Sequence, residues 1–507
     1  MIIALYLLSL AALLVYAPDA LWDPGAREFF VLIGLIGAWR YGWGFLHFLR
    51  SWYYRNVTFA RLRTQLTQAE NAAVKDAGGE PNPELIGPSE LFVVVTSFRI
   101  QAETTAAAYR SIITDAIRCQ RKVTILASIV ENGDQRFIKS IFKQCQPPAR
   151  VKLAFVRLSG LGKRQALAVA LNAIIRHRPA ADAAVAVMDG DTILAPDSFA
   201  RTLPFFALQP EMGGLTTDED SVTAGSKLMG HWHRLRFAQR QILMSSMALS
   251  GKVLAMTGRF SIFRASIATH PDFIRAVRED SIDHWRLGEL KLLTGEDKST
   301  WYWLLKNGWN MLYVPDVRVW TVEHPPANDF LSASSLLMTR WFGNMIRASG
   351  RAIALGPQRC GWFTWWCLID QRVSMWTPLI GPTAVLMAAI FFSPWILYAY
   401  LIWIMFTRLM QTLLLLSVRN TISGLYPFLI YFSQVYGALI KTFVLFRPNR
   451  QRWTRQNIVG PASQTSQNSA VQSALLHGLA MAYLFVGVGF LLGVLQWPSA
   501  LSLSRLF

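Results

Sequence analysis

Long apolar segments lie at both ends of the chain, and they limit the fold more than any other feature of the sequence. A helix of about 20 apolar residues is long enough to cross a bilayer. Of the 507 residues, 52% are hydrophobic and only 16% are charged, values that are unusual for a soluble protein. We therefore expect a multi-pass membrane protein. The apolar segments are residues 2–17, 29–49, 373–393, 395–417, 425–446 and 475–497.

The basic residues beside these segments predict how the chain is oriented. Residues 1–50 have no basic start and no clear cleavage site, which favours a retained helical hairpin over a signal peptide. Arginines follow the hairpin and also fill the loop 447–474, so the positive-inside rule places both regions in the cytoplasm. If both regions are cytoplasmic, one of the C-terminal apolar segments does not cross the membrane. We predict that 425–446 is an interfacial helix and that the chain has five spans, with six as the alternative.

Strand-like and helix-like segments alternate in the middle of the chain, from residue 90 to residue 330. Such alternation predicts an α/β domain with a Rossmann-like, mostly parallel sheet and helices on both faces. Residues 51–89 are interpreted as a cytoplasmic linker, 331–371 as amphipathic interfacial helices, and 372–507 as a second membrane region with a channel. The expected strands are 91–96, 123–130, 151–156 and 183–188, and the expected helices are 104–118, 135–144 and 165–176.

Two aspartates, Asp189 and Asp191, come directly after the apolar strand 183–188. At positions i and i+2 of an extended stretch, both carboxylates point the same way. Ligands of parallel sheets bind at the carboxyl ends of the strands, so the pair is well placed for a divalent cation on a diphosphate. A lone Asp-x-Asp is also frequent in turns, and the pair alone does not decide between the two readings.

Candidate donor-binding residues follow the earlier strands in the same way. Phe98 and Glu103 come after the first strand, and Glu131 and Asp134 come after the second. These side chains could contact the base or ribose of a nucleotide. Each of them is also common in an ordinary loop between a strand and a helix.

Two adjacent cations, Lys163 and Arg164, stand at the start of the third helix. The run 160–165 lacks the spacing of a P-loop. Two positive charges at a helix N-terminus nevertheless suit a diphosphate. A solvated surface pair is the equal alternative.

Two further motifs follow the strands. Gly295-Glu296-Asp297 precedes a helix, where a carboxylate either acts as a general base or interacts with the helix dipole. Arg340-Trp341 lies in the amphipathic segment 332–346. Its tryptophan would either anchor the segment at a membrane interface or stack against a sugar ring.

In order and approximate spacing, these motifs resemble those of the processive family 2 glycosyltransferases, which include the cellulose, hyaluronan and chitin synthases. The resemblance covers about residues 90–460 and implies a GT-A-like domain on the cytoplasmic side of a bacterial inner membrane. The motifs that carry it are Val95-Thr96-Ser97-Phe98, Gly162-Lys163-Arg164, Asp189-Gly190-Asp191, Gly295-Glu296-Asp297, Arg340-Trp341 and, as a gating loop, residues 451–455.

Within that family, residues 338–345 are most similar to the mannuronan synthases. This similarity implies a GDP-mannuronate donor and a polymer of β-1,4-linked mannuronic acid that is exported across the membrane. It also implies a cyclic-di-GMP-binding partner subunit and an export complex. The net charge of +19 agrees with an acidic product. It does not favour nucleic acid, because the basic residues are spread over a membrane protein.

The resemblance implies a role for each motif in an inverting transfer. Asp191, supported by Asp189, would hold Mg²⁺ (or Mn²⁺) on the donor diphosphate, and Asp297, beside Glu296, would be the general base. The remaining donor candidates are Phe98, Glu103, Glu131, Asp134, Lys163 and Arg164, and the candidates for the acceptor and the polymer are Arg340, Trp341, Arg347 and Arg408.

Three departures from the family pattern limit what is carried over. Leu337 stands where the family has the glutamine of Gln-x-x-Arg-Trp, and Gly295 replaces the threonine of Thr-Glu-Asp. The aspartate that usually holds the nucleobase has no clean match, so Glu131 and Asp134 both stay candidates. The rival readings are a synthase of another polysaccharide, a nonprocessive enzyme that loads a lipid carrier, and a transporter with a degenerate nucleotide domain.

Overall fold

The computed structural model describes residues 2–17, 27–76, 86–158, 162–453, 458–459 and 467–495. The chain divides into two compact units. The sheet unit comprises His47–Leu368 and Asn449–Ser463, and the helical unit comprises Met1–Leu46, Ile369–Pro448 and Gln464–Phe507. The segment Gly78–Pro81, part of the predicted linker, lies outside the described residues, as do Gly160, Leu161 and residues 454–455.

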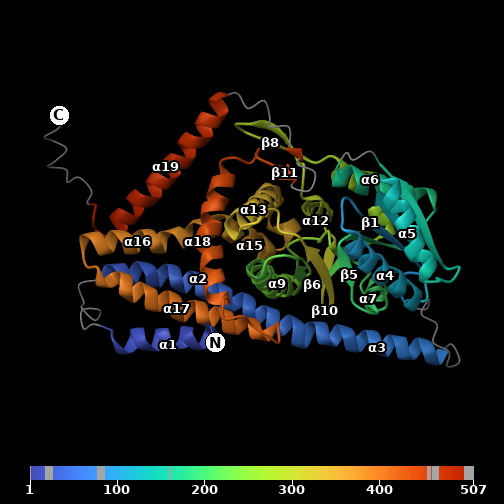
Figure 1. The fold of residues 1–507 in the computed structure, drawn as a ribbon, viewed down its shortest axis with the longest axis horizontal. Coiled ribbons are helices and arrows are strands. Elements are labelled where there is room, and N and C mark those ends of the chain that lie inside the picture. Colours follow the sequence, from blue (N-terminus) through green and yellow to red (C-terminus); the bar gives the residue numbers. More distant parts are fainter. Residues whose placement is uncertain are drawn as a thin grey trace. The chain divides into compact units, whose positions relative to one another are not determined.

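Eight strands of the sheet unit form one mixed sheet, in the order β3-β2-β1-β4-β7-β6-β10-β5. Figure 1 labels β1, β5, β6 and β10 of this sheet. The first four strands in this order are parallel, and β6 is parallel to β10. Strand β7 is antiparallel to both of its neighbours, and β5 is antiparallel to β10 at the edge. The strands are β1 (Glu90–Thr96), β2 (Lys122–Ile129), β3 (Val151–Arg157), β4 (Ala184–Asp189), β5 (Thr192–Leu194), β6 (Met212–Thr223), β7 (Phe260–Arg264) and β10 (Asn310–Glu323).

Helices cover this sheet, and a small hairpin, β8 (Ser281–His284) with β9 (Gly288–Lys291), stands apart from it. Three helices connect the four parallel strands: α4 (Ala102–Arg118), α5 (Asn132–Gln144) and α6 (Lys163–Arg176). The others are α7 (Ser198–Thr202), α8 (Phe205–Leu208), α9 (Lys227–Ala248), α10 (Ala265–Ala268), α11 (Pro271–Arg278), α12 (Glu296–Lys306), α13 (Phe330–Ala354), α14 (Gly356–Cys360) and α15 (Trp362–Val373).

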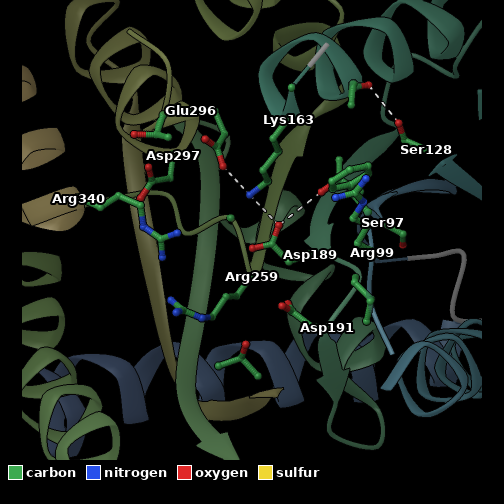
Figure 2. Close-up of a pocket in the computed structure, with 18 of the residues that line it drawn as sticks. Ser97, Arg99, Ser128, Lys163, Asp189, Asp191, Arg259, Glu296, Asp297 and Arg340 are labelled. Carbon is green, nitrogen blue, oxygen red and sulfur yellow. Dashed lines mark hydrogen bonds and ion pairs between the residues drawn. The ribbon is translucent and has the colours of Figure 1, made fainter. Parts of the chain in front are cut away.

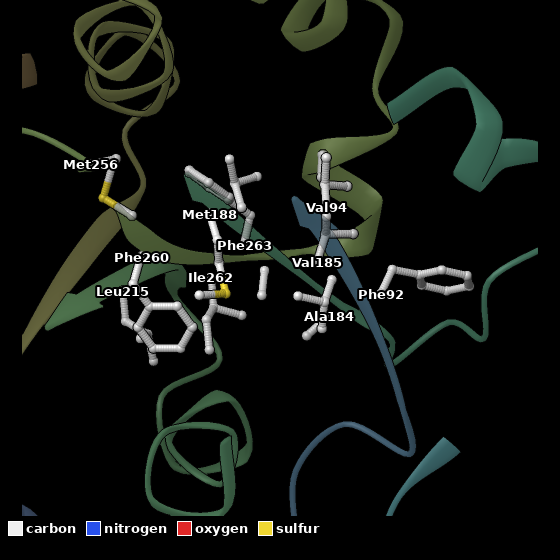
Figure 3. Close-up of a cluster of buried hydrophobic side chains, with 14 of the residues drawn as sticks. Phe92, Val94, Ala184, Val185, Met188, Leu215, Met256, Phe260, Ile262 and Phe263 are labelled. Carbon is white, nitrogen blue, oxygen red and sulfur yellow. The ribbon is translucent and has the colours of Figure 1, made fainter. Parts of the chain in front are cut away.

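The central strands are apolar on both faces because helices bury both faces of a parallel sheet. Leu91 to Val95 of β1 are fully buried, and β4 is almost as well covered. Figure 3 shows side chains of these strands beside Ile262 and Phe263 of β7. The register of β1 and β4 sets Thr96 opposite Asp189, so the polar ends of the two strands meet at one edge of the sheet.

The sequence predicted the first half of this sheet well. All four expected strands and all three expected helices are present, and their ends differ by two or three residues at most. The predicted mixed, mostly parallel sheet is confirmed. Strands β5, β6, β7 and β10 were not predicted individually.

The predicted linker is helical for much of its length. The helix α2 (Arg27–Tyr53) continues through a π-helical turn, η3 (Tyr54–Thr58), into α3 (Phe59–Asp76). Tyr54 is buried, and its hydroxyl donates to the Tyr313 carbonyl oxygen over 2.6 Å. Because such side chains pack against the sheet unit, this segment is part of the folded unit and not a free connection.

Four helices among the described residues are long and apolar enough to cross a membrane: Trp362–Phe391, Trp395–Ser417, Tyr426–Leu445 and Asn468–Leu491. Ile2–Val15 is apolar but shorter. In the helical unit these segments contain α16 (Thr377–Phe391), α17 (Trp395–Leu414), α18 (Tyr426–Leu445) and α19 (Gln467–Leu491), and α1 is Ile2–Val15. The first candidate span continues from α15 through a 3-10 turn at Ser374–Trp376 into α16, so it begins about ten residues before the predicted segment 373–393.

Helix α18 has the length and composition of a span, although its polar residues favoured an interfacial position. Those polar residues have partners on a neighbouring helix. Gln434 donates to Gln411 of α17 over 3.1 Å, and Tyr431 lies against the Arg408 guanidinium. Polar residues that pair between helices are compatible with a membrane interior. The number of spans stays a prediction.

Candidate active site

A cavity of about 530 Å³ opens at the carboxyl ends of β1 and β4 (Figure 2). Several stretches of the sheet unit line it, which brings together motifs that are up to 250 residues apart in the sequence. Among these stretches are residues 96–101 after β1, the Asp-Gly-Asp turn after β4, the start of α6, residues 293–297 at the start of α12, and Leu337, Arg340, Trp341 and Asn344 of α13.

The Asp-Gly-Asp turn packs directly against the end of β1. The Gly190 amide donates to the Thr96 carbonyl oxygen over 2.9 Å. A Cβ at Gly190 would lie 2.3 Å from the Ser97 hydroxyl oxygen, so only glycine fits at this position. The turn therefore holds Asp189 and Asp191 at the cavity wall, as the sequence predicted.

Lys163 bridges two carboxylates that are remote in the sequence. Its ammonium lies 2.6 Å from Asp189 Oδ1 and forms a second, shorter ion pair with Glu296 (Figure 2). Burial works against the charge of Lys163, but the two carboxylates outweigh it and raise the pKa of the ammonium. A Cβ at Gly258 would lie 2.8 Å from Lys163 Nζ, so the glycine leaves room for this bridge.

The two carboxylates of the Glu296-Asp297 pair have different surroundings. Burial would raise the pKa of Glu296, but the Lys163 ammonium outweighs it and lowers that pKa to about 2. Glu296 is therefore ionised and held in an ion pair. Asp297 also lines the cavity, and its carboxylate makes no hydrogen bond or ion pair with the residues that the structure describes. Asp297 is the carboxylate of the pair that is available to a ligand.

Arg259 is a cavity residue that the sequence did not point out. Its guanidinium pairs with Glu323 over 2.7 Å and with Glu219 over 3.2 Å. Burial alone would lower the pKa of the guanidinium, but these carboxylates outweigh burial and raise that pKa. Burial would in turn raise the pKa of Glu323, yet Arg259 lowers it to about 2. The adjacent Gly258 was the only local signal, because a glycine before a cation permits a close backbone approach.

Helix α13 supplies the side of the cavity opposite the turn. Arg340 and Trp341 line it, and Leu337 lies where the family has a glutamine. The Trp341 ring stacks on Trp232 of α9, with ring centres 5.6 Å apart and planes 20° apart. One face of this indole is thus covered by protein, while other atoms of Trp341 line the cavity.

Arg164 does not share the position of Lys163. Its buried guanidinium donates to the carbonyl oxygens of Val277 (3.0 Å) and Thr294 (3.2 Å) and to the Ser299 hydroxyl (3.0 Å). The side chain therefore supports the loop before Glu296 from behind, and it does not line the cavity. The sequence grouped Arg164 with Lys163 as a donor residue, but adjacent residues at a helix start point in different directions, and a donor role of Arg164 stays a prediction.

Other predicted site residues also lie away from the cavity. Glu103, Glu131 and Asp134 do not line it, whereas Phe98 does. Burial, and then the Glu131 charge, raises the pKa of Asp134. Arg347 is buried behind the cavity wall and donates to Asn344 Oδ1 over 2.6 Å.

Arg408 belongs to the helical unit. Its guanidinium donates to the Tyr41 hydroxyl over 2.8 Å. This hydrogen bond pairs Arg408 with a residue of another helix. Such a structural pairing is the alternative to a role of Arg408 in the polymer path.

The segment predicted as a gating loop touches the loop that precedes Glu296. Gln451 is buried, and its side-chain amide accepts from the Leu293 amide and donates to the Lys291 carbonyl oxygen, both over 2.9 Å. Leu293 lines the cavity. One side chain thus joins the C-terminal segment of the sheet unit to the cavity wall.

Comparisons with known proteins agree with this arrangement. Residues 88–344 match the family described as glycosyltransferase like family 2. The chain is 46% identical to the glycosyltransferase alg8 of Pseudomonas syringae pv. tomato over 452 residues, which is 89% of each protein. It is also 46% identical to the glycosyltransferase alg8 of Azotobacter vinelandii over 453 residues, again 89% of each.

Solved structures give a more distant likeness. A mannosyltransferase from Pyrobaculum calidifontis in complex with GDP-Man and Mn²⁺ aligns with 79% of this chain and 98% of that one, at 16% identity and a TM-score of 0.42. GalNAc-T7 with UDP, GalNAc and Mn²⁺ aligns with 54% of this chain and 53% of that one, at 13% identity and a TM-score of 0.32.

Proposed function

Because the chain belongs to glycosyltransferase like family 2, we propose that it is a membrane-embedded, processive polymerase of mannuronic acid. It would transfer mannuronate from GDP-mannuronate to the end of a growing β-1,4-linked chain. The observation that carries this proposal is the cavity itself, where the aspartate pair at the end of β4 and the Asp297 carboxylate, which is unpaired among the described residues, face one space. The choice of mannuronate is supported by the similarity of residues 338–345 to the mannuronan synthases.

The proposed reaction is a single displacement with inversion at the sugar carbon. The 4-hydroxyl oxygen of the acceptor attacks C1 of the donor sugar, and the bond between C1 and the diphosphate oxygen breaks. Asp297 takes the hydroxyl proton, and GDP leaves with the bonding electrons. A general base of this type typically contributes about 10²–10⁴-fold to the rate.

Asp189 and Asp191 fit a divalent cation. No cluster of three or more His, Cys, Asp or Glu side chains is present among the described residues, but Mg²⁺ needs only one or two protein carboxylates when phosphate oxygens complete its shell. Burial raises the pKa of Asp189, Lys163 opposes this shift, and the nearby Asp191 charge adds to it. A cation between the carboxylates would relieve that repulsion. Bound there, it would neutralise charge on the leaving diphosphate.

Lys163 would supply further positive charge at the same place. Its two ion pairs hold the ammonium at the cavity wall between the start of α6 and the start of α12. With a donor bound, the ammonium would turn from Asp189 toward the diphosphate. Such preorganised charge acts without a large rearrangement at the moment of reaction.

The same proposal predicts where the enzyme lies in the cell and which partners it has. The sheet unit would face the cytoplasm of a bacterium, where nucleotide sugars are made, and the helical unit would pass the acidic polymer through the inner membrane. The proposed partners are a cyclic-di-GMP-binding subunit and an export complex. An acidic polymer would suit a chain with a net charge of +19.

A donor comparison tests the proposal. Inner-membrane vesicles that contain the protein and its partner subunit would be incubated with GDP-mannuronate, UDP-glucose or UDP-N-acetylglucosamine, each with and without Mg²⁺. We expect polymer and nucleotide release only from GDP-mannuronate with Mg²⁺. The matched control is Asp272→Asn, which changes a carboxylate that is 61% exposed on α11 and should leave synthesis intact.

The alternatives give different results in the same assay. Polymer made from a UDP-sugar would show that the product is a neutral polysaccharide and not polymannuronate. GDP release with only short, lipid-extractable products would show a nonprocessive enzyme. Absence of nucleotide release from every donor would contradict enzymatic transfer and favour a transporter.

A further inference from the structure

Arg236 of α9 lies against the tryptophan that lines the cavity. Its guanidinium carbon is 4.6 Å from the centre of the Trp341 ring, 5.1 Å from that of Trp232 and 5.8 Å from that of Phe342. Three aromatic rings from two helices therefore surround one cation. Aromatic faces attract a guanidinium, but they do not satisfy its N–H donors.

No carboxylate neutralises Arg236. Within the described part of the chain it makes no hydrogen bond and no ion pair, whereas its neighbours Arg240 and Arg259 both pair with Glu219. Burial, and then the charges of Arg240 and Arg259, lowers the pKa of Arg236 to about 10, so it remains charged at neutral pH. Arg236 is half-buried, and a partly desolvated cation without a counterion is unfavourable. An anionic ligand would remove that cost.

A second donor lies beside the same indole. His233 is only 3% exposed, and its ring centre is 6.3 Å from that of Trp341. Its Nδ1 forms a 3.0 Å hydrogen bond with the Thr223 hydroxyl, while its Nε2 is buried without a partner in the described structure. When Nδ1 accepts from Thr223, Nε2 carries a hydrogen that it can donate. Arg236 and His233 thus both flank Trp341, which lines the cavity, although neither of them lines it.

We propose that Arg236 and His233 form a subsite for the carboxylate of the acceptor sugar, next to Trp341. The proposal rests on the proposed function, since only a uronate acceptor carries this carboxylate. The planar guanidinium matches a carboxylate with two parallel hydrogen bonds, and His233 Nε2 supplies a third. Trp341, which lines the cavity, packs against the sugar ring. Arg236 is then a specificity residue, which selects an acidic chain end over a neutral one.

Oligosaccharide binding tests this subsite without requiring turnover. The full-length protein in lipid nanodiscs would be titrated with tetramannuronate and with its carboxyl-reduced form, a β-1,4-linked tetramannose, by calorimetry. We expect wild type to bind the charged tetrasaccharide about tenfold more tightly, because only this ligand offers carboxylates to the Arg236 guanidinium. Arg236→Gln should remove this preference, and Arg236→Lys should retain part of it.

Two controls separate recognition from folding. Arg234→Gln changes an exposed arginine of the same helix and should leave the preference unchanged. GDP affinity should be the same in all variants. If Arg236→Gln weakens both tetrasaccharides equally, the arginine is structural and the subsite is refuted. A preference that survives Arg236→Gln refutes it as well.

The same nanodisc preparation also separates this inference from the proposed function. Wild-type polymer synthesis from GDP-mannuronate is measured in parallel. Synthesis of polymannuronate by an enzyme that does not distinguish the two tetrasaccharides would overturn the subsite alone.

Discussion

Two cations, Lys163 on the cavity wall and Arg236 beside the cavity residue Trp341, are held in different ways. On the side of the Asp-Gly-Asp turn, Lys163 is bridged by Asp189 and Glu296, so the cation is fully compensated. Beside α13, Arg236 lies among aromatic rings and has no carboxylate partner in the described structure. The first arrangement is a closed ion-pair network, whereas the second lacks an anion.

This difference indicates what each side is suited to bind. A compensated lysine can exchange Asp189 for a diphosphate when a cation neutralises the carboxylates. An uncompensated arginine beside a tryptophan suits an anionic sugar that enters and leaves repeatedly. A processive polymerase needs both properties, since the donor binds once per cycle and the product slides past the acceptor side after each transfer. The predictions below test this division, from the largest effect to the smallest.

Loss of a metal-binding carboxylate should have the largest effect. Asp191→Asn should lower polymer synthesis by about 100-fold or more, because a bound divalent cation contributes several kcal/mol of charge stabilisation. The metal dependence of donor binding should disappear as well. Synthesis would be measured in washed membranes at several Mg²⁺ concentrations, with Asp272→Asn as the control. A near-normal polymer yield would show that Asp191 does not bind the metal of the donor site.

Removal of the bridging cation should affect folding as well as activity. Lys163→Met leaves Asp189 and Glu296 close together without a counterion, and we expect a loss of up to about 3 kcal/mol in the free energy of unfolding. Thermal unfolding in detergent at pH 7 would measure it. Lys139→Met, a change at an exposed lysine of α5, is the control. Unchanged stability would mean that the bridge is not formed in solution.

The pH dependence of the same bridge has a defined sign. The pKa of Glu296 is lowered from 4.5 to about 2 in the folded protein, so its contribution to stability is complete above about pH 4.5 and is lost as the pH falls toward 2. Glu296→Gln should therefore be less stable than wild type at pH 7, and the difference should shrink below pH 4.5. A difference that grows on acidification would contradict the ion pair.

Gln451 should have a local effect on the cavity wall. Gln451→Ala removes two hydrogen bonds to the backbone around Leu293, each worth about 0.5–1.5 kcal/mol. Hydrogen exchange should become faster in residues 288–295 and stay unchanged in β1 and β4. Gln239→Ala, at an exposed glutamine of α9, is the control. Equal exchange in both variants would show that the contact does not hold the loop.

Arg408 should have the smallest effect on the product. Its guanidinium already bonds to Tyr41, so Arg408→Gln should change polymer length by less than about twofold. Arg236→Gln should change it more. Size-exclusion chromatography of the polymer would compare the two variants. A larger effect at Arg408 would move the main carboxylate contact from the sheet unit into the helical unit.

The sequence predicted those parts of the site that depend on a local pattern. Asp189 and Asp191 follow a buried strand, and Lys163 begins a helix, so their position at one edge of the sheet follows from the strand order. The fold of the first four strands followed from the same alternation. These features are set by residues close together in the chain.

Other features depend on contacts that no local pattern contains. Arg164 turns away from the cavity because Val277, Thr294 and Ser299 surround its guanidinium. Arg259 reaches the cavity through pairing with Glu219 and Glu323, which lie on β6 and β10. The sequence could not show the cation of Arg236 beside Trp341, because the two residues are about a hundred positions apart and meet only when α9 packs against α13.

The most direct test of the account separates donor binding from transfer in one variant. Asp297→Asn cannot take the acceptor proton, but it keeps the aspartate pair and the Lys163 bridge. Calorimetry of GDP-mannuronate binding and radiolabel incorporation into polymer would be measured on the same membranes. We predict donor affinity within about twofold of wild type and a loss of incorporation of about 10²–10⁴-fold. Normal incorporation, or loss of donor binding together with incorporation, would contradict the role of Asp297 as the base.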